Sequence, residues 1–356
     1  MEKPKFHKDF KLNGSSFSSE EVLLDFTQNL DDAIFQFLKI WLNNKETIAV
    51  HTSGSTGKPK SILLEKNLMQ NSAKATGAYF SLPAKTKALL CLPIEYIAGK
   101  MMLVRALTLG WQLDYITPSS KPLENVSKSY DFSAMVPLQL ENSLDKIDQI
   151  DALIVGGGAV STTLQNKLQS IKTSVFATYG MTETITHVAV KQLNKLEKWQ
   201  KTNSGKKSFY QTLPNVYIYK DNRNCLVIDA PNVSNDIIFT NDVVQLISDN
   251  KFEWLGRFDN VINSGGVKIH PEKIEEKLSK VIEKRFFVVG IKDDVLGEKL
   301  VLIVEGKEET TLIDKVFNTK LLTKFEQPKA LFFVSKFVET PTGKIQRKKT
   351  LDLINQ

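Results

Sequence analysis

The sequence is poor in the residues that build disulfide frameworks and metal cages. Its 356 residues include two cysteines, Cys91 and Cys225, and four histidines. Two cysteines cannot form a disulfide scaffold and do not by themselves make a zinc site. The 18 glycines and 12 prolines are also too few for a collagen-like or low-complexity chain. These shortages exclude several small structural classes and leave an ordinary globular protein.

Long apolar stretches are missing as well. The first residues lead into no apolar segment of the kind that marks a signal peptide. No run approaches the roughly 20 residues that a membrane span needs. We therefore expect a cytoplasmic protein without a membrane span.

Charge is plentiful, with a mild excess of one sign. Lys plus Arg number 47 and Asp plus Glu number 40, which gives a formal net charge of +7 at pH 7. Such an excess fits a plain lysine-rich surface or an anionic ligand such as a nucleotide. The basic residues are spread along the chain, and the densest run, 347–349, lies almost at its end. We therefore expect no nucleic-acid partner.

The apolar pattern predicts an α/β fold in the first part of the chain. Residues 31–42 have helical spacing, and a second helix is expected from about residue 67. Short apolar strands are expected at 47–51, 61–64, 152–155 and 174–177, several of them followed by glycine. Strands that alternate with helices indicate an α/β sheet whose ligands lie at the strand carboxyl ends.

The pattern changes after about residue 210. Two antiparallel hairpins are expected, from strands 216–219 with 225–228 and from strands 243–247 with 252–255. A compact α+β unit follows, with a helix after Pro271, strands at 286–291, 300–304 and 331–334, and a helix over 311–325. We predict a large N-terminal domain over 1–257 and a small one over 258–356.

Four motifs carry the chemistry. The first is a loop with hydroxyl, glycine and lysine residues after the 47–51 strand, a composition that cradles phosphate: Thr52, Ser53, Gly54, Ser55, Thr56, Gly57 and Lys58. It is not a Walker loop, since Thr52 and Pro59 break that pattern. The triple glycine at 156–158 is likewise not a dinucleotide fingerprint. Taken alone, each segment also fits a plain glycine turn.

The second motif is Tyr179–Thr184, in which a ring suits a base, a hydroxyl suits a phosphate and the Glu183 carboxylate suits Mg²⁺. A structural turn is the alternative in isolation. The third motif spans 256–260 and 264–271, and the fourth, 341–347, ends in a Gly-Lys-x-x-Arg pattern.

The order and content of the four motifs resemble the adenylate-forming superfamily of acyl- and aryl-CoA ligases, peptide-synthetase adenylation domains and luciferases. The resemblance covers residues from about 47 to about 349. It implies a large N-terminal domain, a small mobile C-terminal domain and a two-step reaction. ATP and a carboxylate first give an acyl-adenylate and pyrophosphate, and a thiol such as that of CoA then displaces AMP.

The resemblance also implies roles for single residues. It places the β- and γ-phosphates at Thr52–Lys58, adenine at Gly156, Gly157, Gly158 and Tyr179, and the α-phosphate at Thr182. Gly180 is also assigned to the ATP site. It gives Mg²⁺ to Glu183, ribose to Asp242 and Arg257, the hinge to Asp259, and the CoA side to Gly265 and Gly266. Lys344 matches the catalytic lysine that bridges the α-phosphate and the acyl carboxylate.

The reaction explains why histidine and cysteine are scarce. A carboxylate is already ionised, so its attack on a nucleotide needs no general base. It needs positive charge where negative charge accumulates and alignment for in-line attack. Mg²⁺, Lys344 and the donors of the phosphate loop supply both.

Two departures from the family pattern stand out. The first motif begins at residue 52, much earlier than usual, which implies that an N-terminal portion of the large domain is missing. The ribose motif has Asn241 where glycine is usual, while Asp242 remains.

Residues 91–110 resemble the acyl-pocket segment of o-succinylbenzoate–CoA ligases, with Glu95-Tyr96 where those have an aromatic–histidine pair. Lys100 and Arg105 are then candidates to pair with the distal carboxylate of a succinyl group, or are solvated. The implied substrate is 2-succinylbenzoate, an intermediate of menaquinone synthesis. Another acyl- or aryl-CoA ligase and a non-catalytic nucleotide-binding relative stay open, and the sequence does not show the oligomeric state.

Overall fold

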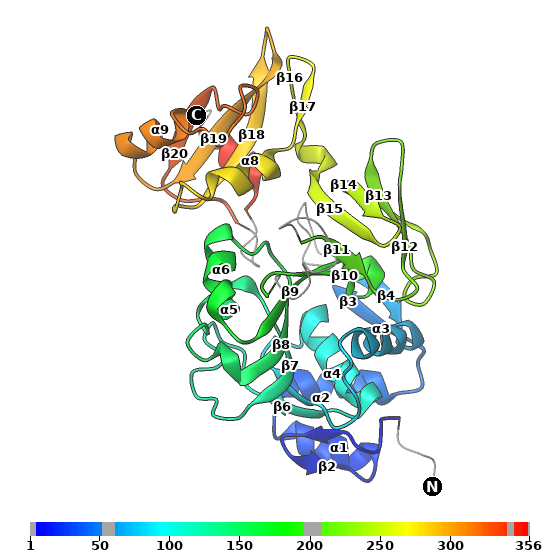
Figure 1. Cartoon of the computed structure of the whole chain (residues 1–356). Helices are drawn as coiled ribbons and strands as arrows, with labels where there is room; N and C mark the ends of the chain where they lie inside the picture. The colour runs from blue at the N-terminus through cyan, green and yellow to red at the C-terminus, as the bar shows by residue number, and fades with distance from the viewer. Residues whose placement is uncertain (1–4, 52–60, 196–207, 340–344, 355–356) are drawn as a thin grey trace.

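The structure is a computed structural model, and it describes residues 5–51, 61–195, 208–339 and 345–354. Within these ranges the fold is α/β, as predicted. A 13-stranded sheet has the order β12-β13-β14-β15-β11-β10-β9-β8-β7-β5-β6-β1-β2, and a five-stranded sheet contains β16 to β20 (Figure 1). The predicted boundary at Phe258–Asp259 falls between β15 and β16, where one sheet ends and the other begins.

The parallel part of the large sheet positions the candidate site. Its strands are β1 (Lys11–Leu12), β5 (Lys87–Leu90), β6 (Gln112–Tyr115), β7 (Tyr130–Met135), β8 (Ile150–Val155) and β9 (Ser174–Gly180), and β2 (Ser15–Ser16) pairs antiparallel with β1 at the sheet edge. β1 pairs in parallel with β6, and the ladder from β6 through β5, β7 and β8 to β9 is parallel throughout. The carboxyl ends of these strands therefore share one edge, where ligands are expected.

Helices cover both faces of this ladder. They are α1 (Glu20–Gln28), α2 (Asp32–Leu42), α3 (Lys66–Tyr79), α4 (Ile97–Leu109), α5 (Pro137–Glu141), α6 (Thr162–Lys167) and the 3₁₀ turns η1 (Ile147–Gln149) and η2 (Leu168–Ser170). Figure 1 shows α5 and α6 on one side of β7–β9 and α2 to α4 on the other. Alternate strand residues accordingly join separate clusters: Phe132 and Ile154 belong to the first, and Leu153 and Val155 to the second.

Local sequence explains where these helices lie. Helix α2 begins after Asp31, whose carboxylate accepts a hydrogen bond from the Ile34 amide at 3.0 Å, and it buries the predicted apolar stripe. The helical spacing predicted Phe35 on this stripe together with Ile34, Leu38, Trp41 and Leu42, whereas the structure buries Phe37 instead. Helix α4 is apolar on nearly all sides and is buried from Met101 to Leu107. A helix of this kind lies within the core.

The predicted hairpins extend the large sheet. The strands are β10 (His187–Gln192), β11 (Tyr210–Thr212), β12 (Tyr217–Lys220), β13 (Cys225–Asp229), β14 (Ile238–Ser248) and β15 (Lys251–Arg257). All their pairings are antiparallel. By contrast, β3 (Thr47–His51) and β4 (Ser61–Glu65) pair only with each other among the described strands, so the predicted 47–51 strand forms outside the main sheet.

The C-terminal unit contains η5 (Phe258–Asn260), β16 (Ile262–Ser264), β17 (Val267–Ile269), α8 (Pro271–Leu278), β18 (Phe286–Asp293), β19 (Gly297–Glu305), α9 (Thr310–Phe317), β20 (Ala330–Val334) and α10 (Arg347–Asp352). The prediction of a helix over 311–325 is wrong in length, because α9 ends at a cap on Asn318, ahead of further polar residues. No helix of the described residues is both long and apolar enough to cross a bilayer.

Candidate active site

Two of the predicted elements lie outside the described residues. These are the phosphate loop Thr52–Lys58 and the catalytic lysine Lys344. Their flanks are described: β3 ends at His51, β4 begins at Ser61, and Glu339 forms an isolated antiparallel bridge with Ile345.

The triple glycine follows β8 directly, at the carboxyl edge of the parallel ladder. The Gly156 amide donates to the Met135 carbonyl at 3.1 Å, which holds the loop against β7. A Cβ on Gly156 would lie 2.6 Å from the Thr178 hydroxyl of β9, so a side chain there would collide with the neighbouring strand. Gly157 has φ +80°, a region that glycine adopts without strain. The segment is therefore a glycine turn, placed where the family implies adenine.

The predicted ribose carboxylate lies in a dense hydrogen-bond cluster. Asp242 is buried, with 6% of its surface exposed. One oxygen, Oδ2, accepts from the Tyr179 hydroxyl at 2.7 Å, and the other, Oδ1, accepts from the Trp254 indole N–H at 3.1 Å. Arg257, the cross-strand partner of Asp242, adds a guanidinium nitrogen 3.6 Å from Oδ1. The structure thus brings Tyr179, Asp242 and Arg257 together, as the family roles imply.

The Tyr179 ring is not free on both faces. It packs edge-on to Phe252 with centroids 5.2 Å apart and tilted to Tyr210 at 5.8 Å. Burial, together with the Asp242 charge, raises the pKa of Tyr179, so its phenol stays protonated and acts as the donor to the carboxylate.

The segment after β9 is tightly constrained. Gly180 pairs with His187, and a Cβ on Gly180 would lie 2.1 Å from the Thr186 carbonyl oxygen. Within the turn Ile185 adopts φ +65° and ψ −61°, an unfavourable conformation for a β-branched residue. The Thr186 amide donates to the Thr184 carbonyl across it at 2.7 Å. Such strain persists only where the surroundings impose it, and it concentrates at functional sites.

The turn η3 (Thr182–Thr184) presents Thr182 and an exposed Glu183. Within the described residues no group of three or more His, Cys, Asp or Glu side chains is placed to share a metal ion. Mg²⁺ at nucleotide sites takes only one or two protein carboxylates and completes its shell with phosphates and water. The single exposed carboxylate of Glu183, next to the predicted α-phosphate contact Thr182, therefore fits an Mg²⁺ ion that binds together with the nucleotide.

The two acyl-side candidates prove to be very different. Lys100, in the first turn of α4, donates to the carbonyls of Ile94 and Glu95, both at 2.7 Å. Its ammonium therefore holds the turn that leads into the helix. Arg105 has 1% of its surface exposed and forms no ion pair with any described residue.

Arg105 belongs to a small buried polar cluster. Its Nε donates to the Thr76 hydroxyl of α3 at 3.3 Å, and Thr76 lies 3.5 Å from His187 Nε2 of β10. The terminal nitrogen Nη2 is buried and has no hydrogen-bond partner among the described residues. Burial lowers the pKa of Arg105 to about 9. Burial and then the Arg105 charge lower the pKa of His187 well below its ordinary value, so its imidazole is neutral.

These two polar clusters adjoin each other. Tyr179 belongs to β9 and His187 to β10, and the backbone pairing joins Gly180 to His187. Along the chain, only the turn 181–186 separates Tyr179 and Gly180 from His187. The arrangement therefore places a candidate ribose site and a buried cation on two sides of one strained turn.

The predicted C-terminal elements lie on the second sheet and its connection. Asp259 in η5 is exposed and accepts from the Asn241 side-chain amide at 3.2 Å. Asn241, which replaces the usual glycine, therefore contacts the predicted hinge. Gly265 (φ +59°) and Gly266 (φ +79°) form the tip of the β16–β17 hairpin. Figure 1 shows this hairpin at the end of the molecule away from β7 and β8.

The sequence reasoning missed several residues of these clusters. Thr76 and Trp254 carried no signal, because a threonine in a helix and a tryptophan in a hairpin have ordinary structural explanations. His187 lies just after the Tyr179–Thr184 motif, but its position in the sequence alone did not identify it as a neighbour of Arg105.

Comparisons with known proteins show the family and the fold of the chain. The family model described as "AMP-binding enzyme" matches residues 23–227, more than half of the chain. The 2-succinylbenzoate–CoA ligase of Lactococcus lactis subsp. lactis is 24% identical over 355 residues, which cover 90% of this chain and 77% of the relative. An enzyme of the same name from Bacillus cereus is 24% identical over 347 residues, with 86% and 70% covered.

Two solved structures are similar over most of the chain. An acyl-CoA synthetase (AMP-forming)/AMP-acid ligase II-like protein from Dyadobacter fermentans is 36% identical, with a TM-score of 0.59 and 90% of this chain and 93% of that chain covered. The o-succinylbenzoate CoA synthetase of Bacillus subtilis, in complex with ATP and magnesium ion, has the same fold, with a TM-score of 0.71, 20% identity, and 85% and 69% covered. The chain therefore belongs to the adenylate-forming family of AMP-binding enzymes.

Proposed function

We propose that this protein is an ATP-dependent carboxylate–CoA ligase and that its acid is 2-succinylbenzoate. The first step forms a bond between a carboxylate oxygen and the α-phosphorus of ATP and breaks the bond to the pyrophosphate leaving group. In the second step the CoA thiol attacks the acyl carbon, AMP leaves, and the thiol proton is released. ATP, the acid and CoA are the substrates.

The observation that carries the substrate assignment is the orphaned guanidinium of Arg105. A buried charge without a partner costs several kcal/mol, so such a group is kept where a ligand supplies the counter-charge. 2-Succinylbenzoate has two carboxylates, and only one of them reacts. The other provides an anion for Arg105, and Thr76 and the neutral His187 supply a polar surround without a second cation.

The nucleotide side supports the adenylation step. Asp242, held by Tyr179 and Trp254, offers a fixed carboxylate for ribose hydroxyls. Thr182 would donate to the α-phosphate, and Glu183 would hold Mg²⁺, which would neutralise phosphate charge when bound with ATP. We assign the catalytic charge next to the α-phosphate to Lys344. The adenylation step needs no general base, because the attacking carboxylate is already ionised.

Two steps in one site also require movement of the small unit. We propose that residues 258–356 rotate about Asp259 relative to residues 1–257, so that Lys344 serves adenylation and the Gly265–Gly266 hairpin faces CoA afterwards. In support, the hairpin lies away from the parallel ladder here (Figure 1).

Names of similar proteins favour this substrate, but the 36% identical structure carries only the general name of an acyl-CoA synthetase-like protein. Another acyl- or aryl-CoA ligase is therefore the second candidate. The test is carboxylate-dependent pyrophosphate release across a panel of acids, followed by detection of the CoA thioester. We expect 2-succinylbenzoate to exceed benzoate and medium-chain fatty acids by orders of magnitude in kcat/KM. Comparable turnover of the monoacids would leave only the general ligase, and no release with any acid would favour a non-catalytic nucleotide-binding relative.

A further inference from the structure

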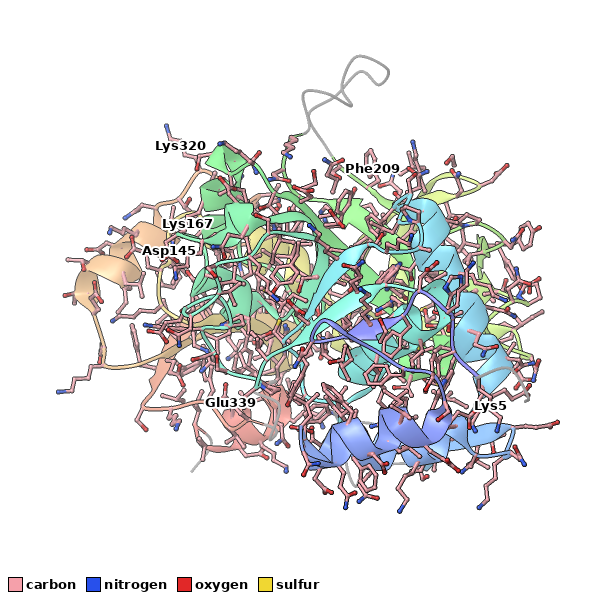
Figure 2. The ribbon with its side chains drawn as sticks, turned by 90° about the horizontal axis from the view of Figure 1, so that it is seen from below. Lys5, Asp145, Lys167, Phe209, Lys320 and Glu339 are labelled. Carbon is pink, nitrogen blue, oxygen red and sulfur yellow. The ribbon has the colours of Figure 1, made fainter. Side chains whose placement is uncertain are left out.

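A pocket of about 470 Å³ lies outside the candidate active site. It is bounded by the N-terminal segment at Lys5–His7, the end of α2, the outer face of α3 and the last turn of α4. Figure 2 labels Lys5 beside the N-terminal helices. Its volume is within the range of small-molecule sites. The α3 residues that line it, Lys66, Gln70 and Lys74, are four apart, whereas Thr76, which contacts Arg105, lies on another face of the same helix.

The lining is strongly cationic. Three lysines, Lys5, Lys66 and Lys74, line the pocket, and no carboxylate does. None of the three forms an ion pair with a described residue. Two acids lie nearby: Glu20 accepts from the Lys5 backbone amide at 3.1 Å and only partly offsets the effect of the Lys5 charge on Lys66, and Asp9 lies 3.8 Å from His7 Nδ1. Burial and then the Lys5 charge lower the pKa of Lys66, as expected for ammonium groups that share a recess.

The ammonium groups of the three lysines have N–H donors that hydrogen bonds within the described residues do not use. Lys5 Nζ donates to Leu42 O at 2.6 Å and to Asn44 Oδ1 at 2.7 Å, and Lys66 Nζ donates to two oxygens of Asn43, at 2.9 and 3.0 Å. Each ammonium has three N–H groups, so one donor remains on each. Lys74 is exposed and makes no hydrogen bond to a described residue. The pocket therefore offers several uncommitted cationic donors.

The rest of the wall is apolar. Phe6, Trp41 and Leu107 line the pocket, and Trp41 and Leu107 are buried. Thr108, at the end of α4, also lines it. An apolar wall joined to cations favours a molecule with an apolar, aromatic body and one anionic group.

We propose that this pocket is a second small-molecule site, which binds an aromatic anion through Lys66 and Lys74 and an apolar wall that includes Trp41. The site is separate from the proposed acyl site, yet it is built on the same two helices, α3 and α4, that carry Thr76 and Arg105. Occupancy at one site is therefore able to influence the other, and any such coupling would be reciprocal.

The test uses naphthalene-1-sulfonate as the anionic probe and 1-naphthalenemethanol as its neutral analogue, followed by titration calorimetry and tryptophan fluorescence on the full chain. Inorganic sulfate alone measures the contribution of the charge without the ring. We expect saturable binding of the sulfonate, with at least about tenfold weaker binding of the alcohol and of sulfate.

Matched variants locate the binding. Lys74→Met removes an exposed ammonium with no other contact and should weaken sulfonate binding about fivefold. Lys66→Gln should weaken it about tenfold or more, with unfolding monitored because Lys66 also binds the α2 terminus. Lys45→Met, a neighbouring exposed lysine outside the lining, should leave binding unchanged. The sulfonate should also bind the Arg105→Met variant normally.

Four results would overturn the proposal. They are no saturable binding to the unmodified protein, equal affinity for the alcohol, insensitivity to Lys74→Met and Lys66→Gln in folded protein, and loss of binding in Arg105→Met. The last would place the probe in the acyl site. None of these results bears on turnover of 2-succinylbenzoate, so the proposed function is tested separately.

Discussion

The two sides of the candidate active site differ in how a buried charge is paired. On one side the charge has several partners, and on the other it has no counter-charge among the described residues. On the nucleotide side, Asp242 has donors on both carboxylate oxygens, from Tyr179 and Trp254, and a guanidinium 3.6 Å away. On the acyl side, Arg105 is more deeply buried, has one hydrogen bond to Thr76, and keeps a terminal nitrogen without any described partner.

This difference separates a preorganised group from an incomplete one. Asp242 is held in place before any ligand arrives, which suits its proposed role of positioning the ribose of ATP, the same substrate whichever acid reacts. Arg105 lacks a counter-charge, and a protein retains such a group only if something else compensates for the cost. The contrast predicts that changes on the nucleotide side affect every acid equally, whereas changes at Arg105 discriminate between acids.

A large effect that does not depend on the acid is expected between the two sides, at Lys344. Lys344→Ala should lower acyl-adenylate formation by roughly 10²–10³ for every acid, since it removes charge stabilisation in the transition state. Thioester formation from presynthesised acyl-adenylate should be nearly unchanged. Single-turnover assays of the two half-reactions measure this, and an equal loss in both would contradict the role.

The Asp242→Asn variant tests whether a change on the nucleotide side affects every acid equally. It retains the shape of the side chain but turns one acceptor into a donor facing Tyr179 or Trp254. We expect the KM for ATP to rise about tenfold to a hundredfold, because a charge-assisted contact is lost and a buried donor is left unmatched. The ratio of kcat/KM between acids should not change. A shift in acid preference would break the proposed division between the two sides.

Arg105→Met tests the cost of the orphaned cation. We expect the free energy of unfolding without ligand to increase by about 1–3 kcal/mol, since a buried charge is replaced by an apolar side chain. Thr76 still donates to the Ser72 carbonyl at 3.0 Å, so no new orphan forms. Lys100→Met is the control and should destabilise the protein, because the carbonyls of Ile94 and Glu95 lose their donor. Denaturant unfolding measures both, and destabilisation by Arg105→Met would show that the cation is already compensated.

The smallest effect concerns pH. Because the pKa of His187 is lowered in the folded state, only the unfolded chain gains this proton just below pH 6.5. Stability from this group is complete above the unfolded pKa and is lost as pH falls toward the folded pKa. His187→Gln should therefore lose about 1 kcal/mol less than the unmodified protein between pH 6.5 and 5.5. Equal pH slopes for the two proteins would show that His187 is protonated in the fold.

The sequence predicted the fold well because its signals are local. The strand–glycine pattern located β8 and β9, and the hairpins of β12 to β15 followed from alternation and turn residues. The α9 end was missed, because apolar spacing continues past the point where Asn318 caps the helix.

The site was predictable only where a motif marks it. Asp242 and Tyr179 were identified, although their direct hydrogen bond was not. Arg105 and Lys100 looked alike in sequence, since both are cations in an apolar segment. The difference between their surroundings depends on the position of each residue on α4 and on partners such as Thr76 and His187. These partners lie far away along the chain.

The most direct test compares kcat/KM for 2-succinylbenzoate and benzoate in the unmodified protein and in Arg105→Met, with Lys100→Met alongside. The account predicts a preference for the diacid of roughly 10²–10⁴ in the unmodified protein and in Lys100→Met, and its near disappearance in Arg105→Met through loss of diacid turnover alone. Two results would contradict the claim that Arg105 pairs with the second carboxylate of the substrate. One is an Arg105→Met variant that keeps the full preference for the diacid. The other is a variant in which kcat/KM falls equally for both acids.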